Sequence, residues 1–171
     1  MRQKERQFIE KLKRKDYEEF ELFYYQYIHL IHHVVSIYAK DDFTQDDLTQ
    51  EIFMRIIQKI ELFDANKSSL TTWIYTLSKN YVLNYIKSKQ SEHIILDDML
   101  VSIQEEWPQT NYKSMKQDLK DVLSYLEYEV LFLKVEFRMK HEDIARVLEV
   151  SIDQSKKAYQ RAKRKAKDIL K

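Results

Sequence analysis

The sequence contains no cysteine and no glycine, and its only proline is Pro108. Without cysteine the chain has neither disulfide bonds nor thiolate zinc sites. Without glycine it lacks the Gly-rich loops that cradle phosphates and the residue that tight hairpin turns favour. No apolar run approaches the roughly 20 residues that span a bilayer. These absences favour an all-α protein in a reducing compartment, and we expect a cytoplasmic location without membrane insertion.

Charge is distributed unevenly along the 171 residues, although the formal net charge is only +1. Residues 1–90 carry 14 Lys and Arg against 13 Asp and Glu, residues 91–130 carry 3 against 9, and residues 131–171 carry 12 against 6. The acidic middle contains the proline and loses helical periodicity, which is typical of a linker. We therefore predict two small helical domains, 1–90 and 118–171, joined by an acidic linker at 91–117.

Three amphipathic helices are predicted in the N-terminal domain, at Tyr17–Tyr38, at Asp46–Asp64 and within Ser68–Lys87. In each of them apolar residues recur every three to four positions, which is the period of a helix with one buried face. The residues expected in the core are Phe20, Phe23, Tyr24, Tyr27, Ile28, Ile31 and Val34 or Val35 in the first helix, Leu48, Ile52, Phe53, Ile56 and Ile60 in the second, and Leu70, Ile74, Leu77, Tyr81 and Tyr85 in the third.

The second helix has an opposite face of acidic, amide and methionine side chains, namely Asp47, Gln50, Glu51, Met54 and Gln58. Such a face is consistent with simple solvation. It is also suited to docking, because acids and a methionine beside apolar residues fit a basic helical partner.

The third helix, in the stretch SSLTTWIYTLSKNYVLNYIK, carries a second stripe beside its apolar one. Trp73, Asn80, Asn84 and Lys87 follow one another at spacings of seven, four and three residues. A flat ring for stacking, amides for base edges and a cation for phosphate suit a single strand or one extruded base. The alternative is that Trp73 only packs in the core.

The C-terminal domain is predicted to begin with one helix from Asp121 to about Phe137. A short helix near Ile144, a turn at EVSI and a cationic helix capped by Asp153 then form a helix-turn-helix. The second helix of such a pair enters the major groove, where Gln pairs with adenine and Lys or Arg with guanine. Alternatives are a solvated basic tail and an unrelated helical pair. The residues expected on or near its groove-facing side are Gln154, Lys156, Lys157, Gln160, Arg161 and Arg164.

The histidines do not form a convincing metal site. His29 and His33 are one helical turn apart and are spaced to share an ion, but no carboxylate motif accompanies them. His141 and Glu142 are not followed by the second histidine of a zinc protease. We therefore expect no catalytic residue, no metal, no cofactor and no small-molecule substrate.

Two segments together carry a family resemblance. DDLTQEIFMRI...FDANKSSLTTWIYTLSKNYVLNYIKSK resembles region 2 of bacterial sigma-70 family factors, and LSYLEYEVLFLKVEFRMKHEDIARVLEVSIDQSKKAYQRAKRKAK resembles region 4. With only an acidic linker between them, the chain is similar to the small extracytoplasmic-function (ECF) group. The resemblance covers roughly residues 17–90 and 118–171, and two motifs in the right order are more specific than either alone.

This resemblance implies a non-enzymatic factor that binds core RNA polymerase and promoter DNA to direct transcription initiation. The β′ clamp helices and the β flap of polymerase would be its partners, and an anti-sigma factor is a further candidate. The β′ contact would use the face of Asp47, Gln50, Glu51 and Met54. Minus-35 recognition would use the helix near Asp153. Capture and melting of the minus-10 strand would fall on the loop 64–69 and on Asn66, Lys67, Trp73, Asn80, Asn84 and Lys87.

The chain departs from the family's pattern at several positions. Glu149 stands where relatives usually have a glycine, Ser155 replaces an apolar residue, Ala158 a cation and Asn84 an acid. We expect these changes to affect the register of the terminal helix and its base contacts, and Asn84 to alter the minus-10 preference. A related alternative is a clostridial-type toxin-gene sigma factor. From other classes, a helical adaptor without promoter recognition would need neither the Trp73 stripe nor the basic helix, and a nucleic-acid enzyme would need a carboxylate cluster.

Overall fold

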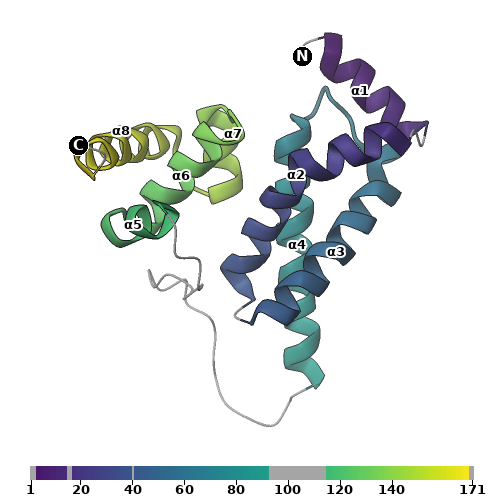
Figure 1. Cartoon of the computed structure of the whole chain (residues 1–171), viewed down its shortest axis with the longest axis horizontal. Helices are drawn as coiled ribbons and strands as arrows, with labels where there is room; N and C mark the ends of the chain where they lie inside the picture. The colour runs from purple at the N-terminus through teal and green to yellow at the C-terminus, as the bar shows by residue number, and fades with distance from the viewer. Residues whose placement is uncertain (1–2, 15–16, 40, 93–114, 170–171) are drawn as a thin grey trace. The chain divides into compact units, whose positions relative to one another are not determined.

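The computed structural model describes residues 3–14, 17–39, 41–92 and 115–169. Throughout these ranges the regular structure is helical and contains no strand, which confirms the predicted all-α fold. The chain divides into two compact units, Met1–Ile94 and Ile95–Lys171 (Figure 1). Most of the predicted linker, residues 93–114, lies outside the described residues.

The N-terminal unit is a bundle in which α2, α3 and α4 pack against one another, while α1 packs on α2 and on a 3-10 turn, η1 (Figure 1). Apolar side chains from all of these helices meet in a single core, with Leu30, Ile52 and Ile74 among the fully buried ones. The bounds are α1 Gln3–Lys13, α2 Tyr17–Tyr38, α3 Asp42–Lys59, η1 Ile60–Leu62 and α4 Leu70–Glu92.

Helix α2 has the predicted bounds, whereas α3 begins at Asp42 rather than at Asp46. The reason is local: the carboxylate of Asp41 accepts the backbone N–H of Thr44 at 2.8 Å and caps the helix. The earlier start brings Phe43 into the first turn of α3, where its side chain is 78% exposed.

The predicted core stripe of α4 is correct only in its first half. Leu70 and Ile74 are buried, but Leu77, Tyr81 and Tyr85 are only partly covered. Farther along the helix, Ser78 and Val82 take the buried positions instead. Helix α4 packs against both α2 and α3, so its buried face lies between two neighbours and is not the one predicted from the largest apolar side chains.

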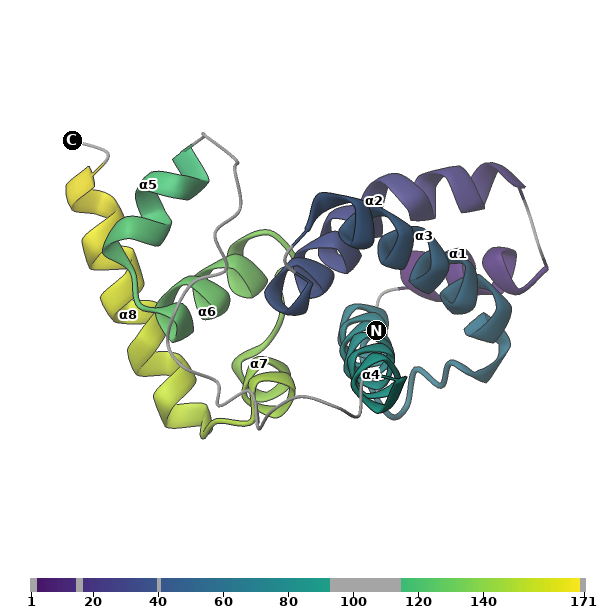
Figure 2. The same cartoon turned by 90° about the horizontal axis from the view of Figure 1, so that it is seen from below.

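The C-terminal unit has α8 lying across α5, α6 and α7 (Figure 2). Its core includes Val130 and Leu133 from α6, Ile144 from α7, and Ala158 and Ala162 from α8. The alanines have no accessible surface, and such small side chains let α8 approach its neighbours closely. The bounds are α5 Met115–Val122, α6 Tyr125–Val135, α7 His141–Leu148 and α8 Ile152–Ile169.

The single helix predicted from Asp121 to Phe137 is in fact two helices, α5 and α6. The first ends at Val122, and Ser124 caps the second: its hydroxyl accepts the N–H of Glu127, and the Glu127 carboxylate accepts the N–H of Ser124. This reciprocal capping box interrupts an apolar pattern that remains periodic across the break, so the pattern alone hides the break.

Helices α7 and α8 form the predicted helix-turn-helix. Glu149 ends α7 in the left-handed conformation (φ 58°, ψ 39°), which glycine adopts without steric cost. The cap of α8 is Ser151 and not the predicted Asp153, because Ser151 Oγ accepts the N–H of Gln154 at 3.1 Å while Gln154 Oε1 accepts the N–H of Ser151 at 2.8 Å.

Candidate nucleic-acid and protein interfaces

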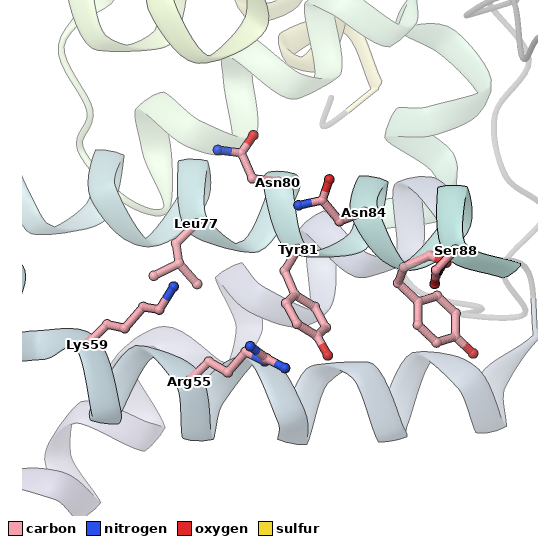
Figure 3. Close-up of a pocket in the computed structure, with 8 residues that line it drawn as sticks. Arg55, Lys59, Leu77, Asn80, Tyr81, Asn84 and Ser88 are labelled. Atoms are coloured by element: carbon pink, nitrogen blue, oxygen red, sulfur yellow. Dashed lines mark hydrogen bonds between the residues drawn. The ribbon is translucent and has the colours of Figure 1, made fainter. Parts of the chain in front are cut away.

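A groove of about 470 Å³ runs between α3 and α4. Leu77 and Tyr81 point from α4 toward α3, and Arg55 and Lys59 point from α3 toward α4 (Figure 3). Asn80 projects from the rim, away from α3 (Figure 3). The groove therefore combines two cations, two amides and two phenol rings in one concavity, and its complete lining is Arg55, Lys59, Leu77, Asn80, Tyr81, Asn84, Tyr85 and Ser88.

The cation at the centre of the groove is held in place by its neighbours. The guanidinium of Arg55 lies 4.6 Å from the centre of the Tyr81 ring and forms an ion pair of 3.5 Å with Glu51. Burial raises the pKa of Tyr81, and its hydrogen bond with Glu51 raises that pKa further, so the phenol stays neutral at physiological pH. A neutral aromatic ring with a fixed cation above it can accept a flat, negatively charged ligand.

The turn before α4 is ordered by its own side chains. Asp64 accepts the N–H of Asn66 at 2.9 Å through its carboxylate and the N–H of Lys67 at 3.0 Å through its carbonyl oxygen. Ser69 Oγ then accepts the N–H of Thr72 at 3.2 Å and caps α4. These bonds leave the side chains of Asn66 and Lys67 exposed on a defined turn.

Trp73 lies at the border between core and surface. Its ring packs against the buried Phe63 with ring centroids 5.5 Å apart and an interplanar angle of 60°, yet its side chain is only partly covered. The stripe predicted along α4 is thus divided: Asn80 and Asn84 line the groove, whereas Trp73 packs on Phe63 and Lys87 is exposed. The prediction missed Arg55 and Lys59, whose only sequence signal was their spacing on the exposed side of α3.

The predicted docking face of α3 is exposed at all four of its residues. Met54 is 54% exposed and stands beside the acids and the amide. Phe43 extends this face toward the N-terminus, since positions 43, 47, 50 and 54 follow the three- and four-residue spacing of one helical side. Phe43 was missed because the helix was predicted to begin after it. The four predicted residues are Asp47, Gln50, Glu51 and Met54. Of these, Glu51 also interacts with two residues that line the groove, Tyr81 and Arg55.

On α8, the exposed side lies opposite a buried row of Ser155, Ala158 and Ala162. Lys156, Gln160 and Arg164 are exposed there, and so is Lys157, which pairs with Asp153 at 2.8 Å. The remaining two predicted contact residues have roles within the protein: Gln154 bonds to Ser151 in the cap of α8, and Arg161 bonds to Glu127.

Glu127 is a buried carboxylate that accepts hydrogen bonds from two cationic side chains of α8. Arg161 Nε donates to its Oε1 at 2.8 Å and Lys165 Nζ donates to its Oε2 at 2.7 Å, while the Glu127 side chain is 4% exposed. Burial alone would raise the pKa of Glu127, but the hydrogen bonds from Lys165, the Ser124 backbone and Arg161 lower that pKa to about 2. The group is therefore ionised at any physiological pH.

Ser155, which stands at a usually apolar position, is fully buried and has a polar partner. Its hydroxyl lies 2.9 Å from Nδ1 of His141 at the start of α7. Burial, together with the charges of Lys134 and Lys156, lowers the pKa of His141. The pair thus links the two helices of the helix-turn-helix.

Among the described residues, no group of three or more His, Cys, Asp or Glu side chains is arranged to hold a metal ion. His32 approaches Asp46 at 4.0 Å on the N-terminal unit. Within the same described ranges, none of the helices combines the length and the apolar character that crossing a membrane requires.

Comparisons with known proteins bear on the family. Residues 23–92 match Sigma-70 region 2. The chain is 28% identical over 80 residues to the ECF RNA polymerase sigma factor SigM of Bacillus subtilis (strain 168), an alignment that covers 47% of the chain and 48% of SigM. The chain thus spans about half the length of the curated relative it matches.

Two solved structures have a similar fold. One is the sigma factor RpoE of Bartonella quintana in complex with the anti-sigma factor NepR, with a TM-score of 0.55 and 17% identity over 90% of this chain and 97% of that chain. The other is CnrH in complex with the cytosolic domain of CnrY, with a TM-score of 0.55 and 13% identity over 97% of this chain and 96% of that chain. At these identities the structures show the fold alone. The region 2 match confirms the resemblance predicted for the N-terminal domain.

Proposed function

We propose, from the match of residues 23–92 to Sigma-70 region 2, that this chain belongs to the sigma-70 family and acts as an ECF sigma factor. In this role it binds core RNA polymerase and directs initiation at promoters that the core does not use alone. It performs no chemistry itself, because strand opening is driven by binding energy while polymerase catalyses RNA synthesis. The site of this work would be the cytoplasm.

The observation that carries the proposal is the presence, in one chain, of a region 2 domain and a helix-turn-helix with a cationic exposed helix face. A duplex-reading helix requires cations for phosphates and amides or guanidinium groups for base edges, and Lys156, Gln160 and Arg164 supply both on the exposed side of α8. A polymerase-binding adaptor would need no such helix.

The groove between α3 and α4 supports a role in holding the minus-10 strand. Asn80 and Asn84 offer amides to base edges, Tyr81 offers a ring, and Arg55 with Lys59 offers charge to the strand's phosphates. The exposed turn at Asn66 and Lys67 adds a second polar surface at the start of α4. In this proposal Trp73 contributes its uncovered ring surface at the edge of the same helix.

The exposed face of α3, including Phe43 and Met54, is the proposed contact for the β′ clamp helices of polymerase, and the C-terminal unit is the proposed contact for the β flap. An anti-sigma factor is a further proposed partner. RpoE of Bartonella quintana was solved with one, which supports the idea for a chain of similar fold.

The test is transcription on genomic DNA with purified core polymerase, with and without the full chain, followed by mapping of the RNA 5′ ends. We expect new start sites that share two upstream motifs at a fixed spacing. A Lys156→Glu/Arg164→Glu variant should still bind polymerase but lose these sites, whereas the control Arg14→Glu, at an exposed residue outside the proposed surfaces, should keep them. Polymerase binding without new start sites would favour the adaptor and refute the proposal.

A further inference from the structure

We propose that Glu127 is a positioning residue that keeps Arg161 and Lys165 of the recognition helix away from DNA phosphates, and so limits sequence-independent binding by α8. The inference rests on the proposed function, in which α8 enters the major groove. It reverses the sequence-based expectation for Arg161, which was predicted to contact DNA directly.

The geometry uses the whole carboxylate. Oε1 of Glu127 accepts Arg161 Nε at 2.8 Å, and Oε2 accepts both Lys165 Nζ at 2.7 Å and the N–H of Ser124 at 3.1 Å. Since the Glu127 side chain is 4% exposed, water has little access to either oxygen. Hydrogen bonds to an ionised, desolvated carboxylate are among the stronger ones in proteins, so both cations are held firmly.

The same contacts fix α8 to two other helices. Lys165 Nζ also lies 3.4 Å from the carbonyl oxygen of Val122, the last residue of α5. Glu127 itself belongs to the first turn of α6. The end of α5, the start of α6 and the middle of α8 are thus joined at one point, on the flank of α8 between its buried row and its exposed side.

The electrostatic consequence follows from the composition of the helix. The segment from Lys156 to Lys171 holds eight cations and one acid, and any duplex attracts such a helix regardless of sequence. A carboxylate from another helix that engages two of these cations reduces the attraction without removing a group from the exposed face. Specific contacts by Gln160 and Arg164 then make up a larger share of the binding free energy.

The experiment measures binding of the full chain to a random-sequence duplex by fluorescence anisotropy between 50 and 200 mM NaCl. The test variant is Glu127→Gln, because glutamine preserves the capping box with Ser124 while removing the charge. Two released cations should steepen the slope of log K against log[NaCl] by about 1.8, at about 0.9 for each phosphate contacted. Across this fourfold range of salt, that change corresponds to about a tenfold larger loss of affinity than the wild type shows.

The control is Glu136→Gln, which removes one exposed carboxylate from the same C-terminal unit. It should leave the slope of log K against log[NaCl] unchanged. A triple variant, Glu127→Gln/Arg161→Gln/Lys165→Gln, should return the slope to the wild-type value, which a general loosening of the fold would not do. Circular dichroism verifies that each variant is folded.

If Glu127→Gln fails to fold, the variant Arg161→Gln/Lys165→Gln, with Glu127 retained, tests independently whether these two cations contact phosphates. Its slope should equal that of the wild type; a slope shallower by about 0.9 or more would mean that these cations contact phosphates directly and would overturn the inference. An unchanged slope in folded Glu127→Gln would overturn it as well. Failure of the wild type to bind any duplex, even at low salt, would refute the proposed function and this inference together.

Discussion

Replacing Glu127 by glutamine should destabilise the C-terminal unit by an amount that depends on pH in a defined way. The folded unit holds the pKa of Glu127 at about 2, against an ordinary value of 4.5. One pKa unit corresponds to about 1.4 kcal/mol, so the ionised carboxylate contributes about 3 kcal/mol at pH 6. Because the folded pKa is lowered, this contribution is complete above pH 4.5 and is lost as the pH falls toward 2. At pH 3 about 1 kcal/mol should remain.

The measurement is urea unfolding of the wild type and of Glu127→Gln at pH 6 and pH 3, followed by far-UV circular dichroism. In a Trp107→Phe background, Trp73 fluorescence reports the N-terminal unit separately, so that the C-terminal transition can be identified. Comparing the two variants at each pH cancels the titration of all other groups. A difference in unfolding free energy that stays constant between pH 6 and pH 3 would refute the ionic role of Glu127.

Three further changes test other parts of the structure. Trp73→Ala should cost the N-terminal unit about 2 kcal/mol through lost packing on Phe63, whereas Trp73→Phe should cost less than about 1 kcal/mol, as measured by chemical unfolding. If Trp73→Phe is stable yet opens promoter DNA poorly in a permanganate assay, the indole also contacts the strand; normal opening would leave it only a packing role. Glu149→Gly should stabilise the C-terminal unit by about 0.5 kcal/mol, whereas Glu149→Val should destabilise it by about 1 kcal/mol, since a β-branched residue opposes the left-handed conformation. The lowered pKa of His141 means that protonation opposes folding, so the unfolding midpoint of this unit should fall as the pH drops below 6.5, and His141→Gln should remove that part of the decrease.

The sequence predicted a helix well where its apolar residues form one unbroken stripe, even for α2, which packs against α1, α3 and α4. Helix α2 has its predicted bounds, because its apolar positions form one unbroken stripe. Helix α4 contacts two neighbours, and its bulky Tyr81 was assigned to the core although it faces a partly open groove beside Arg55. Periodicity identifies an apolar side but does not tell which of two adjacent strips is covered more completely.

The site was harder to predict because several charged residues have partners far away in the sequence. Arg161 carries the expected chemistry at the expected helical position, yet it bonds to a carboxylate 34 residues earlier. Glu127 drew no prediction from the sequence, and only the packing of α6 on α8 brings it to Arg161 and Lys165. Lys156, Gln160 and Arg164 have no partner of this kind among the described residues. For them the position on the helix was enough to predict that the side chain is exposed.

Helix α7 lies between two residues with positive φ, Arg138 before it and Glu149 after it, and they are the only non-glycine residues with this geometry in the described ranges. The eight residues of α7 therefore set the spacing between the turn that contains Arg138 and the turn that contains Glu149, which lead from α6 and into α8. One inserted residue would rotate everything after it by about 100° around the helix axis. Such a rotation would move α8 around the α7 axis and break the packing of its alanine row against α6 and α7. We therefore expect evolution to vary the side chains of α7 freely on its exposed side, but to keep its length unchanged.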